Sequence, residues 1–447
     1  MKTYFPNDYQ AFIHTSRYAK WLDSENRREN WGETVDRYVS NLVLPKIKDD
    51  ETVMAIREAI TDLDVMPSMR AMMSSGKAFD RDNVAGYNCS YLPVDDIRSF
   101  DEAMFILLCG TGVGFSVERQ YVSELPTVPT NLINLDETII VPDSKEGWAY
   151  SLRTLISSLY SGVVPKWDVS LVRPAGAKLK TFGGRASGPA PLVDLFQFVV
   201  SKFKEASGEK LTSLQCHDIM CKIGEVVVVG GVRRSAMISL SNLSDDRMRH
   251  AKSGAYWEAN GQRNLANNSV AYTDKPDSTS FMREWLSLVE SGTGERGIFN
   301  RQAAQNQAAK NGRRDATYEF GTNPCSEIIL RPYQFCNLTE VVIRSTDTEQ
   351  DLERKIAIAT ILGTLQATYT KFPYLRKVWQ DNTDEERLLG VSLTGIMDNP
   401  LTTTANPELP ALLERLRAVS VEVNKEWAGK LGIAVSTAIT AVKPSGT

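Results

Sequence analysis

The sequence has no long apolar run. No uninterrupted apolar stretch reaches the roughly 18 residues that a membrane-spanning helix needs. The first residues, MKTYFPNDYQ, also lack the apolar core of a secretory signal peptide. Both absences argue against a membrane or exported protein and predict an intracellular, cytoplasmic chain.

Histidine is scarce, and cysteine does not occur at zinc-binding spacing. The 447 residues include three histidines, six cysteines and no CxxC pair. We therefore expect no bound metal, and six cysteines are too few for a disulfide scaffold in a chain of this length. Cys109, Cys216 and Cys221 are interpreted as thiols packed in the core.

An excess of charge of one sign is also missing. The 51 Lys and Arg residues nearly balance the 55 Asp and Glu residues, which gives a net charge of -4. No basic field is present to attract a nucleic-acid polymer, so nucleotides would need local anion sites. The composition is that of a globular enzyme, and the length fits either three ordinary domains or one large α/β barrel.

Apolar residues at helical spacing alternate along the chain with short strand-like segments, which predicts an α/β fold with parallel strands. Residues 1–75 are expected to form a helical cap, and residues 76–447 the catalytic core. The expected helices are Phe100–Cys109, Gly147–Gly162, Leu192–Val229, Asp351–Thr370 and Pro407–Leu431. The expected strands include Gly86–Val94, Val169–Pro174 and Val226–Leu240, the last overlapping the end of a helix.

The segment Gly321–Val341, GTNPCSEIILRPYQFCNLTEV, concentrates chemically useful side chains. Asn323, Cys325 and Glu327 alternate, so an extended or tight finger-like conformation would send them to one side. The proline after Asn323 disfavours a helix. Glu327 could act as a general base on a hydroxyl that the amide helps to hold. The alternative is that Cys325 and Cys336 are two buried structural cysteines on a strand.

NPCSE followed by FCNL resembles the active-site finger of the ribonucleotide reductases, and most of all that of the adenosylcobalamin-dependent (class II) ribonucleoside-triphosphate reductases. The likeness runs from about Arg17 to Thr447. The other segments that carry it, in order, are RYAKWL, RRENWGETV, YNCSYLPV, GTGVGFSV, RPAGAKLKTFGGRASGPAPL, VVVGGVRRSAMISL, NNSVAY, GERGIFNR and KPSGT.

The resemblance implies a fold and a reaction. The fold would be a ten-stranded α/β barrel of two five-stranded halves, with the finger of residues 321–341 threaded through its middle. The reaction would reduce ribonucleotides to 2′-deoxyribonucleotides for DNA synthesis. Cys325 would carry a thiyl radical, Glu327 would accept a substrate proton and Asn323 would orient the hydroxyls. Cys89 and Cys336 would form a redox pair, which requires Cα atoms within about 7 Å.

Further residues are implied by the likeness as nucleotide contacts. Substrate contacts are expected at Ser68, Asn88, Gly112, Pro444, Ser445, Gly446 and Thr447, the last four as a phosphate-binding turn. Lys178, Lys180 and Arg185 would belong to a glycine-rich loop between an effector site and the catalytic site. The alternatives are a plain helix-end serine at Ser68, a tight helix-to-strand join at Gly112, and a solvated loop around Arg185.

The sequence departs from the class II pattern in two places. A longer insertion that houses the effector site in monomeric relatives is expected to be omitted between Val117 and Lys145, so a homodimer with an effector site built from paired helices becomes plausible. The family also continues beyond the position of Thr447, so we expect a truncated, split or intein-interrupted product, or a minimal variant.

The sequence leaves three functional hypotheses open. The first is a class II reductase that uses adenosylcobalamin, a dithiol such as thioredoxin, and a deoxynucleotide effector. The second is a class I type catalytic subunit whose radical comes from a separate metal-containing subunit. The third is an inactive or regulatory nucleotide-binding chain. A side chain cannot generate a thiyl radical unaided, so the first two require a cofactor or a partner.

Overall fold

The computed structural model describes residues 4–177, 185–229 and 236–443. The described chain forms two compact units. The first unit comprises the residues up to Asn88 together with those from Phe335 onward, and the second lies within residues 89–334. Within the described residues, no helix is both long and apolar enough to cross a bilayer.

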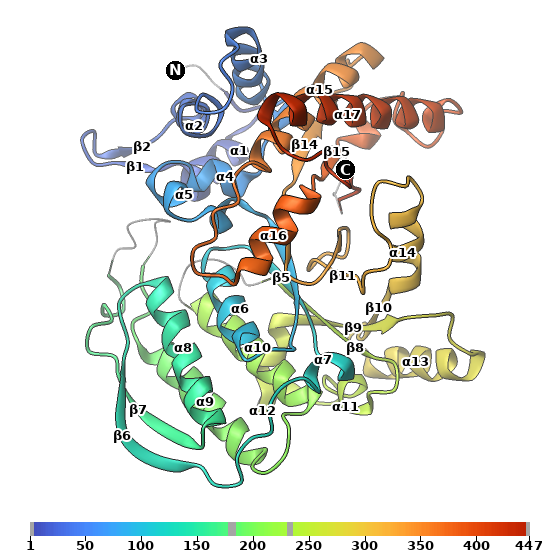
Figure 1. Cartoon of the computed structure of the whole chain (residues 1–447). Coiled ribbons are helices and arrows are strands. Elements are labelled where there is room, and N and C mark those ends of the chain that lie inside the picture. The colour runs from blue at the N-terminus through green and yellow to red at the C-terminus, as the bar shows by residue number, and fades with distance from the viewer. Residues whose placement is uncertain (1–3, 178–184, 230–235, 444–447) are drawn as a thin grey trace. The chain divides into compact units, whose positions relative to one another are not determined.

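Five parallel strands form the centre of the second unit (Figure 1). Each strand pairs in parallel with the next, as in the register of Cys89 with Gly112 and of Val113 with Met237. In spatial order the strands are β10 (Gly297–Asn300), β9 (Ala266–Tyr272), β8 (Met237–Asn242), β5 (Gly112–Ser116) and β4 (Cys89–Pro93).

Helices pack on one face of this sheet. Helix α6 (Arg98–Leu108) is buried from Ser99 onward because it lies between neighbours on several sides, and α10 (Ser213–Val229) packs against it. Phe115 of β5 contacts the ring of His217 on α10. Because side chains alternate along a strand, Gly112 and Gly114 of β5 face the opposite side.

A βαβ unit follows in the same part of the chain. Strand β6 (Ile133–Ile140) pairs in parallel with β7 (Val163–Asp168), and α8 (Lys145–Tyr160) connects them. Helix α9 (Ala190–Glu205) packs on α8 and on α10, so this segment shares its apolar core with the helices of the sheet. Figure 1 shows α6, α8, α9 and α10 grouped together.

Shorter elements complete the second unit. They are α7 (Arg119–Val122), α11 (Asp246–Arg249), α12 (Tyr256–Asn260), η4 (Gly261–Leu265), α13 (Ser278–Ser291), α14 (Arg301–Ala309), β11 (Gly321–Thr322), β12 (Ile329–Leu330) and the start of β13 (Gln334–Cys336).

The first unit is built around a three-stranded sheet. Strand β14 (Thr339–Val342) pairs in parallel with β15 (Val391–Thr394) and antiparallel with β3 (Val65–Met66). Its long helices are α15 (Glu349–Gln366), which a Thr348 capping box begins, and α17 (Leu409–Leu431), which packs on α15.

The remaining elements of the first unit are mostly helical. They are α1 (Asp8–Ile13), η1 (His14–Tyr18), β1 (Trp21–Leu22), β2 (Arg27–Arg28), α2 (Trp31–Tyr38), η2 (Val39–Val43), α3 (Asp50–Thr61), α4 (Met69–Ser74), α5 (Lys77–Arg81), η3 (Asn83–Gly86), α16 (Lys377–Glu386) and η5 (Ile396–Asp398).

The prediction of an α/β fold with parallel strands is confirmed. Two predicted strands have the wrong bounds. The strand predicted at Val226–Leu240 is right only in its last residues, where β8 begins at Met237. Residues 226–229 form the last turn of α10, and Val226 and Val227 are buried there, so tertiary packing overrides their β-branched preference. The second strand was predicted at residues 169–174. The structure instead has strand β7 at Val163–Asp168, directly before the predicted residues.

Candidate active site

The predicted finger is a short hairpin in the second unit. Strand β11 pairs antiparallel with β12, with Thr322 opposite Ile329. Between them the chain makes a tight turn, in which the Ser326 N–H donates to the Asn323 carbonyl oxygen over 2.9 Å and Ser326 adopts a φ of 62°. Cys325 therefore lies at the apex of the hairpin. Its backbone forms a turn and not the extended strand in which successive side chains alternate.

The finger lies directly on the sheet because glycines replace side chains at the contact. A Cβ at Gly114 would come within 1.8 Å of the Thr322 carbonyl oxygen, and one at Gly112 within 3.0 Å of Pro324. A Cβ at Gly321 would come within 2.1 Å of the Tyr91 ring. Residues 321–324, which we call the entering limb of the finger, thus run antiparallel to β5, toward the N-terminal end of that strand.

Hydrogen bonds join three of the predicted catalytic residues. The Asn323 Nδ2 donates to Glu327 Oε2 over 2.5 Å and to the Cys89 sulfur over 3.4 Å. The Asn323 Oδ1 accepts from the Ile328 N–H over 2.9 Å, which fixes the orientation of the amide. Asn323 is fully buried, so one amide links the finger to the first residue of β4.

The six cysteines, all of which lie in the described residues, differ in exposure. Cys325 is exposed and the other five are buried. Burial raises the pKa of the Cys216 thiol, which keeps it protonated and inert. Lys145 Nζ lies 3.0 Å from the Cys109 sulfur. Of these thiols, only that of Cys325 is open to a reactant from solution.

Two predicted substrate contacts lie in the first unit and already have protein partners. The Ser68 hydroxyl donates to the Gly86 carbonyl oxygen over 2.8 Å and accepts from the Ala71 N–H at the start of α4. These bonds account for Ser68 as a helix cap. Asn88 accepts from the Leu338 N–H through its side chain.

The redox partner proposed for Cys89 is also in the first unit. Cys336 is 1% exposed, and its carbonyl oxygen accepts from the Asn88 N–H over 3.3 Å. Asn88 directly precedes Cys89 in the chain. The pairing of the two cysteines stays a prediction.

The predicted effector loop is described only in part. Arg185 is exposed and donates to the Gly176 carbonyl oxygen over 2.8 Å, a contact within its own loop. Lys178 and Lys180 lie outside the described residues, as do Pro444, Ser445, Gly446 and Thr447 of the predicted phosphate turn.

The buried charges at the base of the finger could not be predicted from the sequence. Glu118 and Arg301 form an ion pair whose side chains are 0% and 3% exposed. Arg301 ends the segment GERGIFNR, whose only signal in the sequence is its likeness to the family, and charged residues are expected at the surface unless a partner is known. The pair could have been predicted only if the packing of the segment around Glu118 on the finger had been known.

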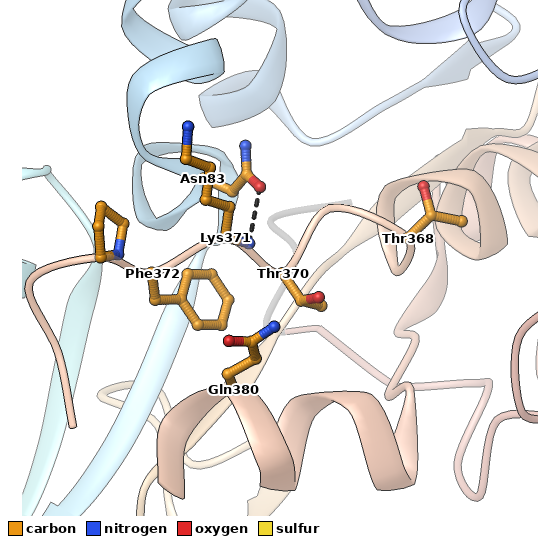
Figure 2. A pocket seen from close by; sticks show the side chains of 7 residues that line it. Asn83, Thr368, Thr370, Lys371, Phe372 and Gln380 are labelled. Atoms are coloured by element: carbon orange, nitrogen blue, oxygen red, sulfur yellow. Dashed lines mark hydrogen bonds between the residues drawn. The ribbon is translucent and has the colours of Figure 1, made fainter. Parts of the chain in front are cut away.

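An open pocket of about 330 Å³ lies in the first unit, and none of the residues predicted from the sequence lines it (Figure 2). Gln380 of α16 points toward the loop that carries Thr370 and Phe372. The Lys371 N–H donates to Asn83 Oδ1 over 2.8 Å and closes one side of the cavity. Amide and hydroxyl groups therefore line a small polar hollow.

Comparison with known proteins shows what this chain is similar to. A family model described as B12-dependent ribonucleotide reductase, insertion domain, matches residues 130–202. Adenosylcobalamin-dependent ribonucleoside-triphosphate reductases of Lactobacillus gasseri and Levilactobacillus brevis are 28% and 29% identical, each across 96% of this chain and 70% of the relative. Over nearly its whole length, the chain is thus similar to adenosylcobalamin-dependent ribonucleotide reductases.

Solved structures of ribonucleotide reductases share the fold. A B12-dependent (class II) ribonucleotide reductase matches with a TM-score of 0.80 and 24% identity, over 97% of this chain and 72% of that one. The class Id α subunit of Actinobacillus ureae matches with a TM-score of 0.60 and 12% identity, over 99% and 74%. The second, weaker likeness shows that the fold is common to both classes.

The match at residues 130–202 corrects the expectation of an omitted insertion. The βαβ unit of β6, α8 and β7 and most of α9 fall in this range, so a segment that corresponds to the insertion domain of class II ribonucleotide reductases is present. The alignment to the Lactobacillus gasseri reductase is 541 positions long, more than this chain has residues, so that relative carries additional residues within the aligned region.

Proposed function

We propose that this chain reduces ribonucleotides to 2′-deoxyribonucleotides by thiyl-radical chemistry at Cys325. The observation that carries the proposal is the exposed thiol at the apex of a finger whose neighbouring Asn323 amide is bonded to both Glu327 and Cys89. Similarity over 96% of the chain to reductases of this class supports it and favours class II over class I.

The chemistry begins at the 3′ carbon of the ribose. Hydroxide leaves an unactivated carbon poorly, and removal of the 3′ hydrogen as an atom weakens the neighbouring 2′ C–O bond. In the proposed mechanism a thiyl radical on Cys325 takes that hydrogen, Glu327 accepts the proton of the 3′ hydroxyl, and Asn323 orients the hydroxyls. The 2′ hydroxyl then leaves as water, with the proton supplied by the thiol pair of Cys89 and Cys336.

Two electrons must enter for each product formed. We assign them to Cys89 and Cys336, which would be oxidised from two thiols to one disulfide while the 2′ carbon is reduced. Cys325 returns the hydrogen atom to the 3′ carbon and regains its radical. A dithiol such as thioredoxin would then restore the pair by thiol–disulfide exchange.

The exposed thiol of Cys325 fits adenosylcobalamin as the source of the radical. The chemistry that such a cofactor supplies when bound is the removal of a hydrogen atom from a thiol. That requires a thiol which a group outside the fold can approach, and Cys325 meets the requirement because it is exposed at the finger tip. Asn323 and the turn bond from Ser326 hold the thiol in place for that approach.

Several finer assignments belong to the same proposal. The fold would be a ten-stranded barrel with residues 1–75 as its cap. Ser68, Asn88 and Gly112 would contact the nucleotide, and Ser445, Gly446 and Thr447 would bind its phosphates together with Pro444. Arg185 with Lys178 and Lys180 would relay a deoxynucleotide effector. We also infer a cytoplasmic location. The homodimer expected from an omitted insertion loses its basis, because a segment that corresponds to the insertion domain is present.

One assay tests the proposal. The purified chain is incubated with ribonucleoside diphosphates or triphosphates, dithiothreitol and adenosylcobalamin, and deoxyribonucleotide is measured. Product formed only with the cofactor is the expected result. Product that requires an added metal-containing subunit would favour a class I catalytic subunit. If neither condition gives product while nucleotide still binds, the chain is a binding protein and the reductase proposal fails.

A further inference from the structure

A buried arginine ties the base of the finger to the central sheet. Arg301 begins α14, and its two terminal nitrogens donate to the two carboxylate oxygens of Glu118 over 3.0 and 2.6 Å. Its Nε donates to the Phe320 carbonyl oxygen over 2.7 Å. Phe320 is the residue before β11, so the guanidinium spans from the end of β5 to the start of the finger.

The geometry of this contact is fixed by its chemistry. A guanidinium and a carboxylate in a bidentate arrangement meet in one plane, which leaves few other orientations. Both side chains are almost completely buried, so water cannot replace either partner. Ser116 Oγ donates to Glu118 Oε2 over 2.8 Å, and this bond anchors the carboxylate on β5.

The returning limb of the finger has an arginine of its own. Arg314 donates to the Ile329 carbonyl oxygen over 2.8 Å and to Gln334 Oε1 over 3.1 Å. Its guanidinium also lies 4.7 Å from the centre of the Phe320 ring. Both limbs are therefore held at their base by buried cations, while the tip carries Cys325.

The limb between the anchor and the tip is short and stiff. Thr322 lies against Gly114 and Pro324 against Gly112, with no side chain between finger and strand. A displacement of Phe320 is therefore carried along the limb to the apex, five residues on in the sequence. We propose that Arg301, held by Glu118, is a positioning residue that sets where Cys325 lies. This inference rests on the proposed function for its catalytic consequence.

Arg301→Lys tests the proposal, because lysine keeps the charge and loses the bidentate contact and the bond to Phe320. Arg296→Lys is a matched control. The Arg296 side chain is 1% exposed and donates to both carboxylate oxygens of the buried Glu284 and to the Asn242 carbonyl oxygen. None of these bonds goes to the finger. Both substitutions disturb a buried arginine–glutamate pair, but only one pair holds the finger.

Two measurements separate positioning from general stability. Hydrogen exchange followed by mass spectrometry reports the protection of residues 321–330. Arg301→Lys is expected to speed exchange there, while Arg296→Lys leaves it unchanged. In the full assay Arg301→Lys is expected to lower kcat by about 10-fold to 100-fold, since small misplacements of a reacting group are costly. KM is expected to stay within about threefold because the finger anchor touches no nucleotide in the proposed mechanism.

The outcomes are distinct. Unchanged exchange and kcat in Arg301→Lys overturn the positioning role, and so does an equal loss in Arg296→Lys. If Arg301→Lys does not fold, Ser116→Ala replaces it, with a smaller change expected in the same direction. If the wild-type chain makes no deoxyribonucleotide, the proposed function fails, and the exchange data alone still decide whether Arg301 positions the tip.

Discussion

At the scale of single residues, exposure separates the thiols by what they can do. A sulfur that exchanges a hydrogen atom must meet a reactant, and Cys325 alone among the six cysteines is exposed. Cys89 is buried and accepts a hydrogen bond from Asn323, which suits a thiol that acts only after substrate is in place. The same amide therefore touches both the proton acceptor and one member of the proposed redox pair.

Cys325→Ser is expected to abolish deoxyribonucleotide formation, because the serine O–H bond is too strong to yield the radical. Nucleotide binding is expected to stay nearly intact, since serine preserves the size and polarity of the tip. Product is measured by chromatography and binding by calorimetry. Cys216→Ala, a change in the buried core of α10, serves as the control and should retain turnover. Loss of binding in Cys325→Ser would mean that this side chain serves nucleotide binding instead.

His14 provides a pH-dependent contribution to stability. Burial lowers the pKa of His14 from 6.5 to about 4, a shift that Glu29 partly opposes. The unfolded chain therefore binds more protons than the folded chain between these values, and stability falls as the pH drops from 6.5 toward 4. The loss attributable to His14 is expected to reach about 3 kcal/mol.

Urea unfolding at several pH values measures this effect. His14→Gln is expected to flatten the difference between pH 7 and pH 4.5 compared with wild type, because glutamine takes up no proton. His250→Gln is the control, since His250 is exposed. An equal pH dependence in wild type and His14→Gln would contradict the assignment.

At the scale of elements, the glycines of β5 decide how the finger lies. The pattern GTGVGFS predicted a turn that approaches a ligand, yet the structure uses these glycines to bring two backbone segments together. Sequence cannot separate the two uses, because each needs only the absence of a side chain.

The finger itself could be predicted from NPCSE, since proline and the polar neighbours are local signals. Arg301 and Glu118 could not, because their pairing depends on contacts distant in sequence.

Gly114→Ala is expected to lower both stability and turnover. The added methyl group would meet the Thr322 carbonyl oxygen at 1.8 Å, so the finger must move away from the sheet. We expect a loss of about 1–3 kcal/mol in the free energy of unfolding, together with reduced kcat. Gly429→Ala in α17, where the methyl group meets open space, should be neutral or stabilising by up to about 1 kcal/mol. Denaturant titration and the product assay check both variants.

At the scale of the whole molecule, the segment that matches the insertion domain is part of a shared core. Alternating helices and strands were enough to predict the α/β class. They were not enough to recognise residues 130–202 as a counterpart of the insertion domain, because the helices and strands of this range look like those of the rest of the chain and its boundaries come only from comparison. Leu155 of α8 is fully buried, and α8 packs against α6. The segment should therefore unfold together with the sheet and not as a separate module.

Leu155→Ala tests that expectation. Removing a buried leucine is expected to cost about 2–5 kcal/mol, and hydrogen exchange in α6 should speed up together with exchange in α8. Tyr150→Ala, at an exposed position of the same helix, should change stability by less than about 0.5 kcal/mol. Faster exchange confined to α8 would indicate an independently folding insertion.

The accessibility of Cys325 also makes the protein sensitive to oxidative inactivation. Peroxide oxidises accessible thiolates stepwise to sulfenic and then to irreversible sulfinic acid, whereas thiols sealed in the interior are spared. Damage would begin at the finger tip, in a protein whose fold is otherwise intact. Anaerobic handling should therefore preserve the working lifetime of the chain more than any gain in thermal stability.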